Sequence, residues 1–240
     1  MIKLITFDLD NTLAKLGKGM TEEDLILLKK IEEQEVTVAV CSGKPTYYLC
    51  GFMRQVGLKH PILVGENGAV IQFGVDLPPE KFYMLPYSEE ARQSLSFLKN
   101  KISKLLPDIW FQPNLTGVTP FPSNEKEFDI IEQCLEQEKS HIKDIEIYRH
   151  NDSFDLVPAG LNKKRGMEVL GNMLMIRPEE TIAAGDGVND YPMFEYAGFS
   201  VGVNVPDETK VDQNFPSSTE MLRYLLEIVE NQINTLEEQI

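Results

Sequence analysis

Acidic side chains gather at two points of the sequence, each directly after an apolar run of the kind that forms a buried strand. Asp8 and Asp10 follow the first such run, and Asp186 and Asp190 follow a late one. Ligands of open parallel sheets bind beyond the carboxyl ends of the strands, so we expect these four side chains to converge. Carboxylates held together repel one another unless a cation lies among them. Because carboxylate oxygens suit Mg²⁺, the pattern predicts a Mg²⁺ site.

A carboxylate site that holds a metal is suited to phosphoryl transfer, in which an aspartate can be the nucleophile and form an aspartyl-phosphate. The reaction also needs cations and N–H groups that neutralise the phosphoryl oxygens. Ser42, Gly43 and Lys44 follow another apolar run, and Lys163 opens an expected helix. Together with nearby backbone N–H groups, the side chains of Ser42, Lys44 and Lys163 are therefore candidates for binding phosphate.

Strand-like and helix-like segments alternate at the start of the sequence and again near its end. Strands are expected at 3–7, 36–40, 61–64, 69–73, 181–184 and 200–203, and helices from 21 onward and at 46–55, 163–173, 189–197 and 221–236. A β-α-β-α-β order is typical of a parallel sheet with helices on its faces. The expected fold class is α/β, with a doubly wound parallel-sheet (Rossmann-like) core.

The middle of the sequence follows another pattern, because prolines punctuate it repeatedly from residue 78 onward. Two helical stretches, 88–105 and 124–138, are each followed by two short strand candidates, at 110–111 and 116–119 and then at 146–149 and 153–157. This α-β-β-α-β-β order predicts an inserted α+β domain with an antiparallel sheet. We place the core at 1–79 and 154–240 and the inserted domain at 80–153.

Composition excludes several classes of partner. Lys and Arg total 23 and Asp and Glu total 38, giving a net charge of −15. An acidic surface without a basic stripe repels nucleic acid and anionic membrane. No apolar run approaches the length of a membrane span, and the first one is interrupted by acids, unlike a signal peptide. Three cysteines without CxxC spacing favour a reducing compartment. We expect a cytoplasmic monomer or homodimer.

Four motifs occur in a fixed order, and they resemble those of the haloacid dehalogenase superfamily. They are Asp8-x-Asp10-x-Thr12, Ser42, Lys163 and Gly185-Asp186-x-x-Asn189-Asp190. The resemblance covers essentially the whole expected core. The inserted domain looks like a type 2 cap, and the sequence Glu66-Asn67-Gly68-Ala69 before it strengthens the similarity to the Cof-like, class IIB branch.

The resemblance implies a role for each motif residue. Asp8 would be the nucleophile and a metal ligand. Asp10 would be the general acid and then the general base, and its backbone carbonyl would also bind Mg²⁺. Lys163 would neutralise the nucleophile and the phosphate. Asp186 would bind the metal directly, and Asp190 would be a further metal-binding residue that completes the acidic end of the site. The phosphate-binding set implied is Thr12, Ser42, Gly43, Lys44 and Asn189.

Two residues depart from the pattern of the branch. Asn11 stands where glycine is common, and Asn tolerates left-handed backbone better than most residues. Lys44 stands where arginine is common, and lysine cannot bind phosphate bidentately. A direct contact between Lys44 and phosphate is therefore left open.

The function expected from these residues is Mg²⁺-dependent hydrolysis of a small phosphorylated metabolite, a sugar phosphate or a phosphoglycolate-like monoester. The alternatives are a phosphotransferase of the phosphomannomutase type and a non-catalytic regulatory protein on the same fold. The cap would close over the site and supply substrate contacts. A polar and aromatic cluster in the inserted segment is a candidate for those contacts: Trp110, Gln112, Asn114 and Thr116.

Overall fold

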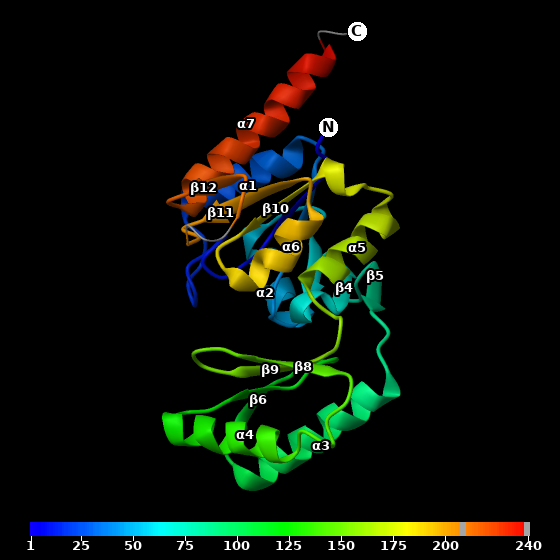
Figure 1. Cartoon of the computed structure of the whole chain (residues 1–240). Helices are drawn as coiled ribbons and strands as arrows, with labels where there is room; N and C mark the ends of the chain where they lie inside the picture. The colour runs from blue at the N-terminus through cyan, green and yellow to red at the C-terminus, as the bar shows by residue number, and fades with distance from the viewer. Residues whose placement is uncertain (207–209, 238–240) are drawn as a thin grey trace. The chain divides into compact units, whose positions relative to one another are not determined.

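The computed structural model describes the backbone of residues 1–206 and 210–237 and the side chains up to residue 232 outside that gap. The chain divides into two compact units, one formed by Met1–Tyr83 with Asn162–Ile240 and the other by Met84–Leu161. We call the first unit the core and the second the inserted unit (Figure 1).

The core is built on one eight-stranded sheet in the order β12-β11-β10-β1-β2-β3-β4-β5. The pairs from β12 to β3 are parallel, and β4 runs antiparallel to β3. The strands are β1 (Leu4–Phe7), β2 (Thr37–Cys41), β3 (Ile62–Gly65), β4 (Val70–Phe73), β5 (Lys81–Met84), β10 (Thr181–Gly185), β11 (Phe199–Val203) and β12 (Gln213–Phe215).

Helices cover both faces of this sheet. Ile5 and Phe7 of β1 belong to a buried cluster with residues of α1, α2 and α7. The alternate residues Leu4 and Thr6 are also fully buried, and they point to the other face, where α5 and α6 pack against each other (Figure 1). The helices are α1 (Glu22–Glu33), α2 (Thr46–Val56), α5 (Lys163–Leu174), α6 (Tyr191–Tyr196) and α7 (Ser218–Glu237).

Three short 3₁₀ turns complete the core: η1 (Glu66–Gly68), η2 (Pro178–Glu180) and η3 (Val188–Asp190). The helix expected at 189–197 is therefore divided, with its first residues in η3 and the rest in α6. The core also contains two strands that the sequence did not indicate, β5 and β12. Both are three or four residues long and mostly exposed, so they carry no buried apolar run.

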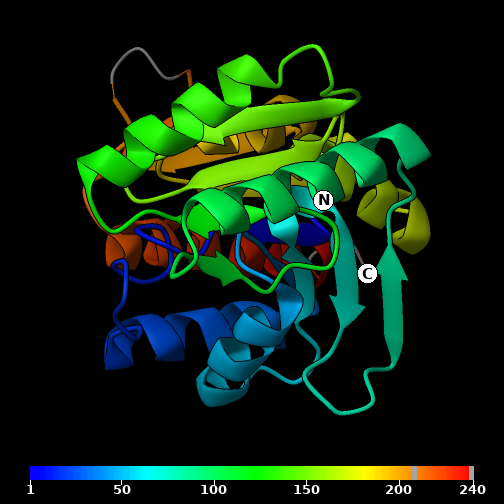
Figure 2. The same ribbon diagram turned by 90° about the horizontal axis from the view of Figure 1, so that it is seen from below.

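The inserted unit consists of two α-β-β repeats, in the expected order. Its elements are α3 (Glu89–Leu105), β6 (Trp110–Gln112), β7 (Thr119–Phe121), α4 (Glu125–Gln137), β8 (Ile145–Arg149) and β9 (Phe154–Pro158). The hairpins β6-β7 and β8-β9 are antiparallel, and a bridge between Val118 and Leu156 joins them. Figures 1 and 2 show α3 and α4 on one side of the strands.

Two expectations for the inserted unit differ from the structure. The strand expected at 116–119 lies at Thr119–Phe121, because Thr119 rather than Thr116 pairs with Gln112. The core was expected to resume at residue 154, but the whole of β9 pairs with β8. Residues 154–161 therefore belong to the inserted unit, and the first boundary also lies later, after residue 83.

Within the described residues, no helix is both long and apolar enough to cross a membrane.

Candidate active site

The carboxyl end of β1 is the point where the order of the parallel strands reverses. From β1 the chain first extends the sheet to one side through β2 and β3, and later to the other side through β10, β11 and β12. Such a switch point is where open α/β sheets bind ligands. Asp8 follows β1 here, with Ser42 after β2 and Asp186 after β10 on either side of it.

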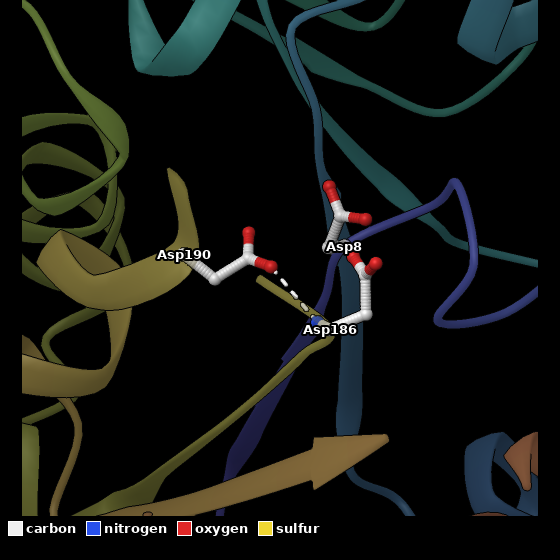
Figure 3. A group of neighbouring side chains, drawn as sticks. All are labelled: Asp8, Asp186 and Asp190. Atoms are coloured by element: carbon white, nitrogen blue, oxygen red, sulfur yellow. Dashed lines mark hydrogen bonds between the residues drawn. The ribbon is translucent and has the colours of Figure 1, made fainter. Parts of the chain in front are cut away.

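Three carboxylates meet at this point, those of Asp8, Asp186 and Asp190. One oxygen of each lies within 4.8 Å of the others (Figure 3). Asp190 is fully buried, Asp8 is 4% exposed, and Asp186 is half-buried. One oxygen of Asp190 accepts hydrogen bonds from the backbone N–H groups of Asp186 and Gly187, at 2.9 and 3.1 Å. Asp190 thereby fixes the loop that presents Asp186.

Lys163 is the cation of the cluster, and its side chain is 1% exposed. Its Nζ donates to Asp8 Oδ1 at 2.6 Å and to Asp190 Oδ1 at 2.5 Å. Burial alone lowers a lysine pKa, but the carboxylates of Asp190 and Asp8 raise the pKa of Lys163 above its ordinary value. The ammonium therefore stays charged. The adjacent cations point elsewhere, since Lys164 pairs with Glu195 and Arg165 with Glu168, all with exposed side chains.

The three carboxylates outnumber this one ammonium, and the pKa values of Asp8 and Asp186 are raised. Burial raises the pKa of Asp8 to about 7; the charge of Asp190 adds to the rise, and Lys163 opposes it. Burial and Asp190 also raise the pKa of Asp186 to about 6. Carboxylates that are desolvated and crowded in this way are stabilised by a cation. The donor set, with all ligand atoms oxygen, therefore fits Mg²⁺.

The other residues expected at the site lie around this cluster. Thr12 is fully buried and its hydroxyl donates to Asp8 Oδ2 at 3.4 Å. Ser42 is also buried, and its Oγ accepts a hydrogen bond from the backbone N–H of Lys44 at 3.2 Å. Lys44 Nζ lies 3.8 Å from the carboxylate of Asp10. Of the remaining two, Gly43 is half-buried and Asn189 is exposed.

A contact that the sequence did not predict places the first turn of α5, and with it Lys163. The η1 turn has three successive residues with positive φ, which are Glu66, Asn67 and Gly68 at 52°, 55° and 98°. A Cβ on Gly68 would lie 2.3 Å from the carbonyl oxygen of Asn162, and a Cβ on Gly166 would lie 2.6 Å from Gly68 Cα. Only glycines allow the two backbones to approach so closely. The sequence shows both glycines, but it does not indicate that they contact each other, so their role can be recognised only in the structure.

Cys41 is the last residue of β2 and lies within electrostatic reach of Lys163 and Asp8. Its thiol is fully buried, and burial raises the pKa of Cys41 to about 12. A thiol of that pKa is not a nucleophile near neutral pH. Cys41 is therefore not a candidate for a nucleophile at this site.

An open α/β sheet with carboxylates and a buried lysine at its switch point has the groups that the binding of a divalent cation and an anionic ligand would require. A family model described as haloacid dehalogenase-like hydrolase matches residues 5–81 and 80–212. The chain belongs to this family, and the expected superfamily and fold class are confirmed.

Characterised relatives of the chain include phosphatases of two kinds. A phosphoglycolate phosphatase from Thermoplasma volcanium is 26% identical over 221 residues, which cover 91% of this chain and 92% of the relative. A 5-amino-6-(5-phospho-D-ribitylamino)uracil phosphatase from Bacillus subtilis is 23% identical, and the match covers 89% of this chain and 92% of the relative.

Solved structures share the fold over nearly the full length of the chain. A protein from Thermotoga maritima has a TM-score of 0.74 at 17% identity, covering 93% of this chain and 97% of its own. A haloacid dehalogenase-like hydrolase from Bacteroides thetaiotaomicron has a TM-score of 0.70 at 21% identity, covering 94% and 100%.

Proposed function

We propose that the chain is a Mg²⁺-dependent phosphatase of small phosphorylated metabolites, with Asp8 as its covalent nucleophile. The observation that carries this proposal is the buried Lys163, held between Asp8 and Asp190 at the switch point of the sheet. Membership of a hydrolase family and the phosphatase names of the relatives support it.

In the first step, a carboxylate oxygen of Asp8 attacks phosphorus, and the bond between phosphorus and the leaving oxygen breaks. Asp10, as the carboxylic acid, donates its proton to that oxygen, so an alcohol leaves and an aspartyl-phosphate remains. Lys163 neutralises charge on Asp8 and on the phosphoryl oxygens. In the second step, Asp10 takes a proton from water as the water attacks phosphorus, which releases phosphate and regenerates Asp8.

We assign the cation to the carboxylates of Asp8 and Asp186 and to the backbone carbonyl of Asp10. Bound there, Mg²⁺ would offset the repulsion between the carboxylates and the phosphate dianion. Both oxygens of Asp190 already accept hydrogen bonds from Lys163 and from the loop at 186–187. We therefore assign Asp190 to positioning Lys163 and the loop that presents Asp186, in addition to its expected place among the metal-binding residues. Thr12, Ser42 and the backbone around Gly43 are assigned to orienting Asp8 and the phosphoryl group.

The test is phosphate release from p-nitrophenyl phosphate and a panel of sugar phosphates, with Mg²⁺ or EDTA. Asp8→Asn is expected to lower kcat by at least about 10³-fold, because the amide of Asn cannot form the acyl-phosphate. Asp129→Asn, the same change at an exposed position of α4, is the matched control and should leave kcat unchanged. An Asp8→Asn variant as active as the wild type would remove Asp8 from the proposed role.

The same assay distinguishes the proposed phosphatase from the phosphotransferase alternative. An enzyme of that type would depend on a sugar bisphosphate and would release little net phosphate from monoesters. Turnover of p-nitrophenyl phosphate with stoichiometric release of phosphate is the outcome expected here.

A further inference from the structure

The η1 turn is bonded to the loop that follows β2. Two successive N–H groups of the turn donate to that loop, the one of Glu66 to the carbonyl oxygen of Lys44 and the one of Asn67 to that of Ser42, each at 3.0 Å. We call residues 42–44 the β2 loop, and it is the segment assigned to orienting the phosphoryl group. The turn therefore holds this loop at both of its ends.

The ends of the turn also contact the two helices beside it. A Cβ on Gly68 would lie 2.3 Å from the carbonyl oxygen of Asn162, the residue that caps α5 directly before Lys163. A Cβ on Gly65, which precedes the turn, would lie 2.8 Å from the backbone nitrogen of Thr46, the first residue of α2. The backbone has no room for a side chain at either end. A movement of the turn would therefore displace the β2 loop and α5 together.

The backbone of the turn is strained at a residue that is not glycine. Glu66 has a φ of 52°, in the left-handed region, which costs free energy for a residue with a Cβ. Its side chain is buried, with 5% exposed. Strain of this kind persists only where the surrounding contacts determine the conformation, and it gathers at functional sites. Here those contacts include the two hydrogen bonds to the β2 loop.

The side chain of Asn67 packs against the middle of the β2 loop. A Cβ on Gly43 would lie 3.3 Å from Oδ1 of Asn67 and 3.4 Å from its Nδ2. The carboxamide therefore covers the side of Gly43 on which another residue would carry its side chain. Asn67 itself has a φ of 55°, which asparagine tolerates better than most residues. Its backbone and its side chain thus both restrict the position of the loop.

We propose that η1 is a positioning element that keeps the β2 loop and Lys163 in a fixed relation, and that Asn67 is a positioning residue that acts through Gly43. The proposal rests on the proposed phosphatase function and adds the element that aligns its phosphate-binding groups. Ser42 and Lys163 are far apart in the sequence, yet both are assigned to the same phosphoryl group. Their alignment matters because a displacement of about 1 Å can lower a rate about 10²-fold.

The first experiment compares Asn67→Gly with the wild type in the hydrolysis of p-nitrophenyl phosphate at saturating Mg²⁺. Glycine accepts the left-handed backbone, so the variant removes only the carboxamide. We expect kcat to fall about tenfold, whereas KM and the inhibition constant of inorganic phosphate should change less than about twofold. Asn204→Gly is the matched control, because Asn204 also has a positive φ, of 52°, and its side chain bonds to Pro216. Its kcat should be unchanged, and the Tm values of the two variants should fall by similar amounts.

Three results of this experiment would overturn the proposal. One is a kcat of Asn67→Gly equal to that of the wild type. Another is a rise in KM and in the inhibition constant of phosphate that accounts for the whole loss of kcat/KM, because the carboxamide would then bind the phosphoryl group directly. The third is a loss of kcat that follows the loss of folded protein, which would make Asn67 a structural residue alone.

The second experiment tests the contact between Asn67 and Gly43. The φ of Gly43 lies outside the left-handed region, so alanine fits the backbone there, and the nearest atoms to its Cβ are those of the carboxamide. Gly43→Ala should lower kcat, because the added methyl group displaces the loop. In Asn67→Gly that space is free, so the same change should cause little further loss. Losses that multiply in full in the double variant would show that the two residues act independently, and would contradict the role of Asn67.

The outcomes separate this proposal from the one on which it rests. If Asp8→Asn is inactive and Asn67→Gly is as active as the wild type, the phosphatase function stands and η1 is not the positioning element. If the wild type hydrolyses neither p-nitrophenyl phosphate nor any of the sugar phosphates, both proposals are wrong.

Discussion

The switch point of the core and the two hairpins of the inserted unit both hold polar side chains joined by hydrogen bonds, but these side chains are stabilised in opposite ways. At the switch point, Asp8, Asp190 and Lys163 are almost completely buried, and opposite charge offsets much of their desolvation. In the inserted unit, hydrogen bonds join the amides of Gln112 and Asn114 and the hydroxyl of Thr119 to the carboxylate of Asp155. The first arrangement holds several charges in one buried cluster, whereas the second consists mostly of neutral groups.

This difference predicts how substitutions in the two regions should differ in their effects. A buried ion cluster depends on every member, because removing one charge leaves its partners unpaired in a low-dielectric environment. In a network of hydrogen bonds between mostly neutral groups, one substitution removes about the free energy of a single bond. Changes at the switch point should therefore abolish turnover, whereas a single change in the network of the inserted unit should cost about the free energy of one hydrogen bond.

The largest of the expected effects is at Lys163, so this residue gives the strongest test of the comparison. Lys163→Met removes the cation and leaves Asp8 and Asp190 facing each other, so kcat should fall at least about 10³-fold. The free energy of unfolding should fall by about 3–5 kcal/mol, because the buried carboxylates lose their partner. The control is Lys164→Met, one residue further on and exposed. Equal activity of the two variants in the phosphate-release assay would contradict the site as described.

A smaller effect is expected from the backbone contact that places α5. Gly166→Ala puts a Cβ 2.6 Å from Gly68 Cα and 2.8 Å from its carbonyl oxygen, so the first turn of α5 must move and carry Lys163 with it. We expect kcat to fall about tenfold or more with little change in KM, and the free energy of unfolding to fall by about 1–3 kcal/mol. Gly51→Ala in α2, where a Cβ meets nothing within 4 Å, should leave kcat unchanged.

The smallest effect is the dependence of stability on pH and Mg²⁺. The pKa values of Asp8 and Asp186 are raised to about 7 and about 6, above the ordinary value of about 3.9 in unfolded chains. In EDTA, both groups therefore favour folding below pH ~4, and their contribution is lost as pH rises to about 7. Mg²⁺ should reverse this trend, because it binds the ionised carboxylates.

The measurement is the Tm at pH 5 and at pH 8, each with EDTA or Mg²⁺. Mg²⁺ is expected to raise the Tm more at pH 8 than at pH 5, since protons compete with the metal at the lower pH. Asp186→Asn should reduce that difference. A Tm that does not respond to Mg²⁺ at either pH would argue against a metal site at these carboxylates.

The sequence by itself determined the class of fold and several of the residues that meet at the switch point of the core. A buried strand that ends in acid at Asp8 or at Asp186 is a local pattern, so apolar runs and their boundaries located both strand ends correctly. The helical spacing to Met167 and Leu170 also selected Lys163 from three adjacent cations, a choice in accord with its burial between Asp8 and Asp190. The roles of these residues remain predictions until the variants are measured.

Only the tertiary structure decided the features that depend on contacts between distant parts of the chain. These are the pairing that places residues 154–161 in the inserted unit, the approach of Gly68 to Gly166, and the network that joins Thr119 to Asp155. The short strands β5 and β12 also became visible only through their partners. A local pattern reports which face of an element is buried. Which residue covers that face depends on packing and strand register, which no single segment contains. The bond between Thr119 and Asp155 and the approach of Gly68 to Gly166 join residues that are 36 and 98 positions apart.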